Sequence, residues 1–143
     1  MGLKWRGDAV FRDTQDAAEE ALKQFDLRLE GAAKKELYKG HGVLTGTLRR
    51  SIHAANPSYL WSMDDTVPSD NSPERGGRAP EIEKRGLTLW GAVGSGLVYA
   101  LAIHQGFGSF GGYHYITKPF ESLRRSGAIV KDFRSEMRKK GYK

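Results

Sequence analysis

The chain has 143 residues, no cysteine and a formal net charge of +6 at pH 7. Its length suits one domain with a single core, and without cysteine it has neither disulfide bonds nor thiolate chemistry. It lacks both a run of roughly 18 apolar residues for a membrane span and the apolar centre of a signal peptide, so we expect a soluble, unprocessed protein that does not enter a membrane.

The charge is distributed unevenly along the chain. Residues 13–38 hold seven acidic and four basic side chains, a net charge of −3, whereas residues 118–143 hold nine basic and three acidic ones, a net charge of +6. A basic surface can meet phosphates, but a solvated basic helix face is the commoner explanation. The charge by itself therefore does not identify a DNA-binding protein.

A long amphipathic helix is predicted from Asp13 to Tyr38, because apolar residues recur there at spacings of three and four. The apolar positions are Ala17, Ala18, Ala21, Leu22, Phe25, Leu29, Ala32, Ala33 and Leu37. Asp13 or Thr14 is expected to accept hydrogen bonds from the first turn. Gly40 or Gly42 is expected to end the helix in a left-handed conformation.

The following segment alternates partly with a period of two, which predicts a strand from Leu48 to Ala54. Leu48 and Ile52 are expected to face the core. Gly42 and Gly46 permit the turn that precedes this strand, and their spacing does not fit a phosphate-binding P-loop.

A long exposed loop is predicted from Asp64 to Pro80, where three prolines and two adjacent glycines accompany almost no apolar side chains. A second strand is predicted from Leu87 to Ser95. The loop is therefore interpreted as an insertion in a hairpin, and a further short strand from Tyr59 to Met63 is left open.

The C-terminal part is expected to contain a buried apolar segment, then the glycine-rich turn or flap "GFGSFGGYHY", then a helix. Pro119 suits the first turn of that helix, and Gly127 is its weak point. The apolar stripe consists of Phe120, Leu123, Ile129, Val130, Phe133 and Met137. The order predicts a single α+β domain over residues 1–143: a long N-terminal helix and a C-terminal helix packed on a small, mainly antiparallel β-sheet with a long hairpin loop.

Candidate catalytic and metal-binding residues lack the spacing that their chemistry needs. The histidines are His41, His53, His104 and His114, and the loop acids are Asp64, Asp65, Asp70 and Glu74. No two histidines stand four residues apart as in a helical metal pair, the acids do not fit a calcium loop, and no serine lies in a nucleophile elbow. We therefore expect no metal, no cofactor and no catalytic nucleophile.

A small basic ribonuclease is the alternative enzyme, with a histidine as general acid or base and arginines holding phosphate. His53 follows Arg49 and Arg50 closely, and His104 precedes the glycine-rich turn. A buried structural histidine is the commoner interpretation, because nothing in the sequence fixes a second catalytic group. A small basic nucleic-acid-binding protein belongs to the same alternative.

Three short stretches stand in a distinctive order: "TGTLRRSI" at 45–52, "GAVGSGLVYALAIHQGF" at 91–107 and "TKPFESLRRS" at 117–126. With the long N-terminal helix, they resemble the tail-completion, or minor tail, proteins of long-tailed bacteriophages. The matching positions are Gly46, Leu48, Arg49, Ser51, Ile52, Val93, Gly94, Ser95, Tyr99, Ala100, Pro119 and Phe120. His104 to Phe107 departs from the family pattern, which commonly has an acidic residue before Gly-Thr.

The resemblance implies a non-enzymatic virion protein that joins the head connector to the tail tube as a ring around the DNA channel, with six subunits. The implied partners are other copies of the chain, a head connector or stopper protein and a tail tube or tail terminator protein. Genomic DNA passes through the channel without sequence-specific binding. The implied location is the neck or upper tail of the virion, and the host cytoplasm during assembly.

A ring requires that one face of each subunit meets a different face of the next. The opposite charges of the two ends suggest such a contact, in which acids of one subunit align with bases of its neighbour. The acids are Glu19, Glu20 and Asp26, and the bases are Arg134, Arg138 and Lys139. Arg49 or Arg50 is expected to face a neighbour or the channel, unless both are only solvated charges.

Overall fold

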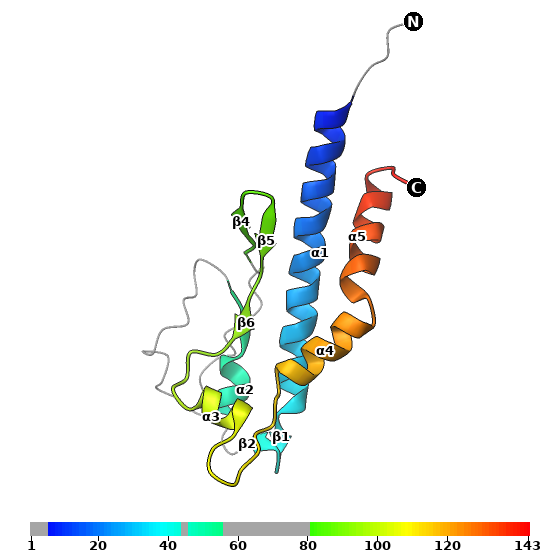
Figure 1. The fold of residues 1–143 in the computed structure, drawn as a ribbon. Coiled ribbons are helices and arrows are strands. Elements are labelled where there is room, and N and C mark those ends of the chain that lie inside the picture. The colour runs from blue at the N-terminus through cyan, green and yellow to red at the C-terminus, as the bar shows by residue number, and fades with distance from the viewer. Residues whose placement is uncertain (1–5, 44–45, 56–80) are drawn as a thin grey trace, which may run out of the picture.

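The computed structural model describes residues 6–43, 46–55 and 81–143. The helices are α1 (Gly7–Glu36), α2 (Thr47–Ser51), α3 (Ala100–Gln105), α4 (Thr117–Arg125) and α5 (Ala128–Lys139). The strands are β1 (Tyr38–Lys39), β2 (Gly42–Val43), β3 (His53–Ala54), β4 (Glu83–Arg85), β5 (Thr88–Trp90) and β6 (Val93–Gly94). The α+β class is confirmed, with α4 and α5 on one side of α1, β4–β6, α2 and α3 on the other, and β1 and β2 at the C-terminal end of α1 (Figure 1).

The first helix is longer at its start than the sequence pattern indicated. α1 has 30 residues, a length of about 45 Å, and begins six positions before Asp13. The predicted cap is wrong, because Thr14 lies inside the helix and donates its hydroxyl to the Val10 carbonyl at 2.8 Å. No proline interrupts the preceding residues, and Asp8 in the first turn interacts favourably with the helix dipole.

The C-terminal end of α1 also differs from the prediction. The helix ends at Glu36, and Leu37 is already extended. Gly40 does adopt a positive φ of 84°, but it does so in the tight turn between β1 and β2, where Tyr38 and His41 exchange backbone hydrogen bonds. The left-handed glycine therefore closes a turn after the helix instead of capping it.

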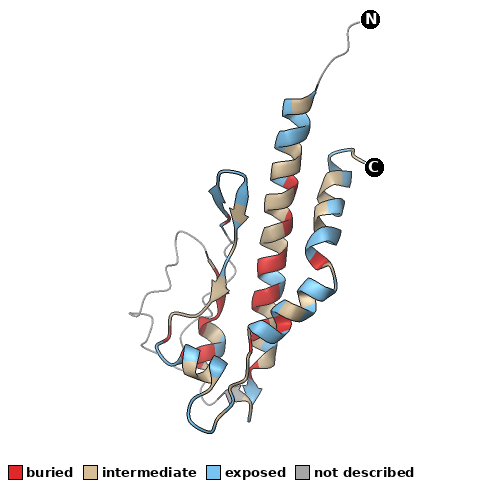
Figure 2. Ribbon diagram, in the orientation of Figure 1, coloured by how far each residue is buried: buried red, intermediate tan, exposed pale blue. Residues whose placement is uncertain are grey.

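The buried residues of α1 anchor two hydrophobic clusters at successive levels along the helix. Figure 2 shows that the buried residues of α1 lie in its middle and C-terminal parts, whereas its first turns are exposed. The cluster on the strand side contains Ala33, Leu37, Leu48, Ile52, Leu97, Ala100 and Tyr115. The cluster on the α4–α5 side contains Phe25, Leu29 and Ala128. Both layers of the domain thus depend on one helix.

The C-terminal helices pack along α1, and α5 runs antiparallel to it (Figure 1). Arg28 of α1 forms a two-pronged ion pair with Asp132 of α5, with N···O distances of 2.7 and 2.8 Å. Nearer the start of α1, Asp13 accepts a hydrogen bond from the Tyr142 hydroxyl at 2.8 Å. The predicted weak point is confirmed, because Gly127 has a φ of 67° and separates α4 from α5.

The predicted strand from Leu48 to Ala54 is wrong over most of its length. Thr47–Ser51 form the short helix α2, which starts after Gly46 in a left-handed conformation, and only His53–Ala54 are extended. Leu48 and Ile52 are nevertheless buried, at 4% and 0% exposure. Two apolar residues four positions apart share one side of a helical turn as well as one face of a strand, so their burial does not distinguish the two structures.

The strands form three separate two-stranded pairs instead of one continuous sheet. β3 and β6 pair antiparallel, as the arms of the predicted hairpin should, and β4 and β5 form a second antiparallel hairpin between them in sequence. β1 and β2 are parallel. The predicted strand 87–95 is split into β5 and β6. The predicted loop 64–80 and the optional strand 59–63 lie outside the described residues.

The glycine-rich segment forms a closed turn. Phe107 and Phe110 exchange backbone hydrogen bonds of 2.9 Å in both directions. Gly106 and Gly112 lie back to back, so closely that a Cβ on either would collide with the backbone of the other. Glycine is required at both positions because no side chain fits between the two backbones.

None of the helices in the described part of the chain is both long and apolar enough to cross a bilayer. α1 has the length, but charged residues occur throughout it.

Two glycines provide a matched test of the packing around α1. A Cβ on Gly91 would lie far inside van der Waals contact with Asp26 Oδ2, whereas a Cβ on Gly31, within α1, would meet nothing within 4 Å. We expect Gly91→Ala to lower the free energy of unfolding by about 1–3 kcal/mol. Gly31→Ala should raise it by about 0.5–1 kcal/mol, because alanine restricts the unfolded chain. Urea denaturation measures both, and equal effects would contradict the described contact between α1 and Gly91.

Candidate functional site

The residues that carry the resemblance are far apart in sequence but meet in the fold. Ser51, at the end of α2, lies 2.6 Å from Ser95 through their hydroxyl oxygens. Next to this contact, His53 pairs with Gly94 across β3 and β6. Ala100 belongs to the same cluster as Leu48 and Ile52. The first two matching stretches therefore form one packed unit.

The third matching stretch joins the unit through α4. Pro119 is buried in the first turn of α4, as the sequence predicted, and the Phe120 ring packs edge-on against Phe25 with centroids 5.9 Å apart. Ile116, just before α4, contacts both hydrophobic clusters. The stretch thus connects the strand side of α1 with the side on which α4 and α5 lie.

Three of the matching residues are exposed. Tyr99 is 42% exposed and Phe120 39% exposed, and Arg49 is also exposed. Arg50 instead lies against Gly46: a Cβ added to Gly46 would come within 3.1 Å of the Arg50 guanidinium. Of the two arginines, Arg49 is therefore the one whose side chain is open to a neighbour.

An apolar groove runs between α1 and α5. It has a volume of about 220 Å³ and is lined by Ala18, Ala21, Ile129, Val130 and Phe133. Ile129 and Val130 remain 37% and 48% exposed. Small alanines on α1 opposite branched side chains on α5 leave this space unfilled within the single chain.

The residues expected to lie between subunits do not all remain accessible. Asp26 is only 4% exposed, so it is corrected from a surface acid to a buried one. Glu19 binds Lys84 of β4 at 2.7 Å and Lys23 at 3.1 Å. On α5, Lys139 is paired with Glu136.

Of the three bases expected at the subunit contact, Arg134 and Arg138 remain exposed. Neither forms an ion pair with any residue in the described ranges. Glu20, on α1, is partly buried and accepts a hydrogen bond from Gln24 at 3.2 Å. The opposite charges of α1 and α5 are thus partly used within the chain, since Lys140 also lies 3.3 Å from Asp13 and 3.5 Å from Asp16.

The buried Asp26 has no described hydrogen-bond partner for its Oδ2 atom. Burial disfavours the ionised carboxylate, which raises the pKa of Asp26 from 3.8 to about 6. Glu30, one turn later on the same face, is compensated: its carboxylate accepts the Ala54 backbone N–H at 2.9 Å and binds Lys34 at 2.8 Å. The periodicity of α1 did not predict the burial of Asp26 and Glu30, because acidic residues on a helix are usually exposed.

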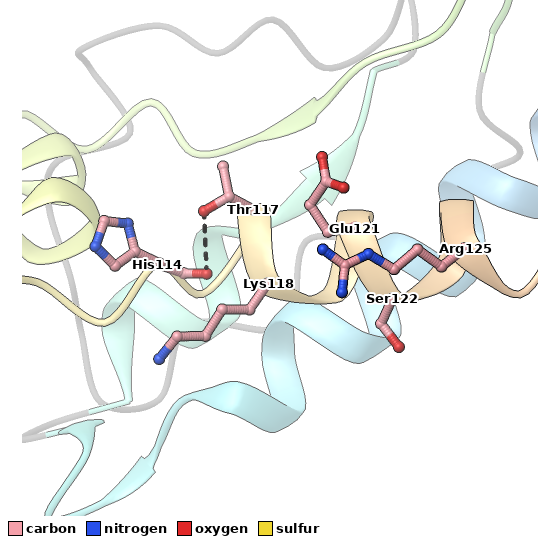
Figure 3. A pocket seen from close by; sticks show the side chains of 6 residues that line it. All are labelled: His114, Thr117, Lys118, Glu121, Ser122 and Arg125. Atoms are coloured by element: carbon pink, nitrogen blue, oxygen red, sulfur yellow. Dashed lines mark hydrogen bonds between the residues drawn. The ribbon is translucent and has the colours of Figure 1, made fainter.

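An open pocket of about 510 Å³ lies over the N-terminal half of α4, and the sequence reasoning missed it (Figure 3). It is lined by His114, Thr117, Lys118, Glu121, Ser122 and Arg125. The sequence pattern that could have predicted this pocket is the spacing of Lys118, Ser122 and Arg125, which stand at i, i+4 and i+7 on one helix face.

His114 has an unusual backbone conformation at the edge of this pocket. With a φ of 52°, it is the one non-glycine residue in the described ranges with a positive φ. Its carbonyl accepts the Lys118 N–H at 3.0 Å and the Thr117 hydroxyl at 3.4 Å, and its own N–H donates to His104 at 2.9 Å. These bonds hold the strained residue against the first turn of α4.

The histidines occupy different environments. His53 is 3% exposed and its Nδ1 lies 2.8 Å from the Ser51 carbonyl, so it is a buried structural residue. His41 is packed between Tyr38 and Tyr113. The His104 and His114 rings have centroids 5.6 Å apart, and burial together with His114 lowers the pKa of His104. The described residues contain no group of histidines and acids that could hold a metal ion.

Comparison with protein-family models, with curated proteins and with solved structures found no match for this chain.

The burial of Asp26 predicts a specific pH dependence of stability. Because the folded-state pKa is raised, the ionised carboxylate destabilises the fold above about pH 6, and protonation relieves this cost as the pH falls toward 3.8. We expect Asp26→Asn to raise the free energy of unfolding at pH 8 by about 1–3 kcal/mol. The gain should shrink between pH 6 and pH 4.

Chemical denaturation at several pH values measures this difference. Asp8→Asn, which removes an exposed carboxylate from the same helix, controls for the change in net charge. A gain from Asp26→Asn that is the same at pH 8 and pH 4 would show that Asp26 is not ionised in a buried site.

Proposed function

We propose that this chain is a tail-completion protein of a long-tailed bacteriophage, a structural subunit that joins the head connector to the tail tube in a ring around the DNA channel. The observation that carries the proposal is the convergence of the three matching stretches on one packed unit. Ser51 contacts Ser95, β3 pairs with β6, and Pro119 and Phe120 bring α4 onto the same helix.

The kind of residue in that unit favours a structural role. Leu48, Ile52 and Ala100 are buried and contact one another, and the Ser51 hydroxyl satisfies the Leu48 carbonyl at 2.7 Å. Residues that are buried and bonded to each other fix an architecture. A catalytic constellation would instead point its polar atoms into a cleft.

The surface offers two unlike faces for contact between subunits. One is the apolar groove between α1 and α5, with Ile129 and Val130 exposed at its rim. The other is the hairpin of β4 and β5 on the opposite side of α1 (Figure 1), where Leu87 and Trp90 are 81% and 52% exposed. A heterologous interface, which closes into a ring, requires such a pair of different surfaces.

Fewer charged residues are available for the proposed contact than the sequence implied. Asp26 is buried, and Glu19 and Lys139 are already paired within the chain. Of the predicted contact bases, Arg134 and Arg138 remain available to a neighbour. Charges of this kind direct encounter and register more than they add affinity.

Joining of heads to tails tests the proposed function directly. Phage particles assembled without this chain are expected to accumulate as DNA-filled heads and separate tails, and added purified protein should restore joined, infectious particles. Arg134→Glu/Arg138→Glu protein should fail to restore them while it remains folded. Arg12→Glu/Lys143→Glu protein, with the same change in charge elsewhere, should succeed. Normal tailed particles formed in the absence of the chain would exclude the function.

A ribonuclease is kept as a second candidate because one observation favours it. His104 pairs with the ring of His114, which lines the α4 pocket together with Lys118 and Arg125. Burial lowers the pKa of His104, which favours the neutral form that a general base needs. Cleavage of RNA should then be lost in His104→Ala and His114→Ala and retained in His41→Ala. Intact RNA after incubation with the wild-type protein would eliminate this candidate.

A further inference from the structure

We propose that the pocket over α4 binds the backbone phosphates of duplex DNA, so that α4 is a DNA-contacting face of the subunit. The relevant side chains come from one helix and the strained residue before it: Lys118, Ser122 and Arg125 share a face of α4, and His114 closes the N-terminal end. Figure 3 shows the Arg125 side chain extended back along α4 toward its first turn. The pocket therefore gathers positive charge over the helix surface.

The charge of the pocket is not neutralised within the described chain. Its one acid, Glu121, is already bound by Arg124 at 2.8 Å. Lys118 and Arg125 form no ion pair with the residues that the structure describes. Two cations thus remain for a ligand, and the surrounding segment 118–143 adds further basic charge.

The polar groups of the pocket match the oxygens of a phosphodiester. Lys118 supplies an ammonium and Arg125 a guanidinium fork, the groups that bind phosphate most often in proteins. The hydroxyls of Thr117 and Ser122 can add hydrogen bonds, as they do at nucleic-acid backbones. Contacts of these four groups with phosphate oxygens carry no information about the bases, so the proposed contact is independent of sequence.

An extended polyanion fits this pocket better than a free ion. The pocket is open to solvent, and 510 Å³ is far more space than one phosphate ion fills. Lys118 and Arg125 are seven residues apart, a rise of about 10 Å along the helix, and one DNA strand carries a charge every 3.4 Å of its axis. The choice of duplex DNA as the polyanion rests on the proposed function.

The test measures binding of a fluorescent 30-base-pair duplex to the full-length protein as a function of salt. For the wild type, log K should fall linearly with log salt concentration, with a slope of about 0.9 for each phosphate contacted. Lys118→Gln/Arg125→Gln should weaken binding at least tenfold at low salt and reduce the slope by about two. A duplex of scrambled sequence should bind equally well.

The control is Arg12→Gln/Lys143→Gln, which makes the same change in net charge. These residues belong to the first turns of α1 and the C-terminus, at the end of the molecule away from the pocket (Figure 1). The DNA affinity of this control variant should stay within about twofold of the wild type. An equal loss in both double variants would show that only net charge matters and would overturn the proposal.

Competition separates backbone phosphates from a free anion. Replacing chloride by inorganic phosphate at the same ionic strength should leave DNA binding nearly unchanged, and displacement by millimolar phosphate would mean a small-anion pocket and contradict the DNA assignment. The joining of heads to tails is scored separately. DNA binding that depends on Lys118 and Arg125 supports the pocket even where heads and tails join without this chain, so the two proposals fail independently.

Discussion

The packing of α1 against both layers of the domain is the constraint on which the rest of the structure depends. An isolated helix gains little from its own hydrogen bonds, and most helical stability in proteins comes from packing. α1 contributes Ala33 and Leu37 to one hydrophobic cluster and Phe25 and Leu29 to the other. Neither layer contacts a second long helix or a wide sheet, so each requires α1 to complete its core.

The contact of α1 with the strands is unusually polar for a packed face. Glu30 is 9% exposed, yet both of its oxygens are bonded, one to the Ala54 backbone and one to Lys34. One turn earlier, Asp26 faces Gly91 without such compensation. A buried carboxylate that accepts a strand N–H fixes the position of that strand along the helix, whereas the unpaired Asp26 costs stability and obliges position 91 to be glycine.

The sequence predicted the elements whose patterns are long and periodic. The middle of α1, the break at Gly127, the burial of Leu48 and Ile52 and the place of Pro119 in a first helical turn are confirmed. Apolar spacing and the conformational limits of glycine and proline are local properties. It did not predict α2, since five residues contain too little pattern to separate a helical turn from a strand.

The candidate sites were harder to predict, because they depend on distant contacts. Whether an acid on α1 is exposed depends on what packs over it, and Gly91 covers Asp26 from 65 positions further along the chain. The α4 pocket likewise needs the left-handed His114, whose conformation is held by backbone bonds to α3 and α4. No periodicity in the sequence reports such bonds.

Ion pairs within the chain use part of the electrostatic asymmetry of the sequence. Lys140 of the basic C-terminal segment pairs with Asp13 and Asp16 of the acidic α1, whereas the Arg28–Asp132 pair joins a base of α1 to an acid of α5. Exposed pairs of this kind each contribute little, although the two-pronged Arg28 pair has the better geometry. What remains on the surface is positive charge on α4 and the outer side of α5, beside an unfilled apolar groove. Because most acids of α1 are engaged, in the proposed ring the groove rather than charge matching would supply most of the affinity between subunits, and the residual cations would be left for the proposed polyanionic partner.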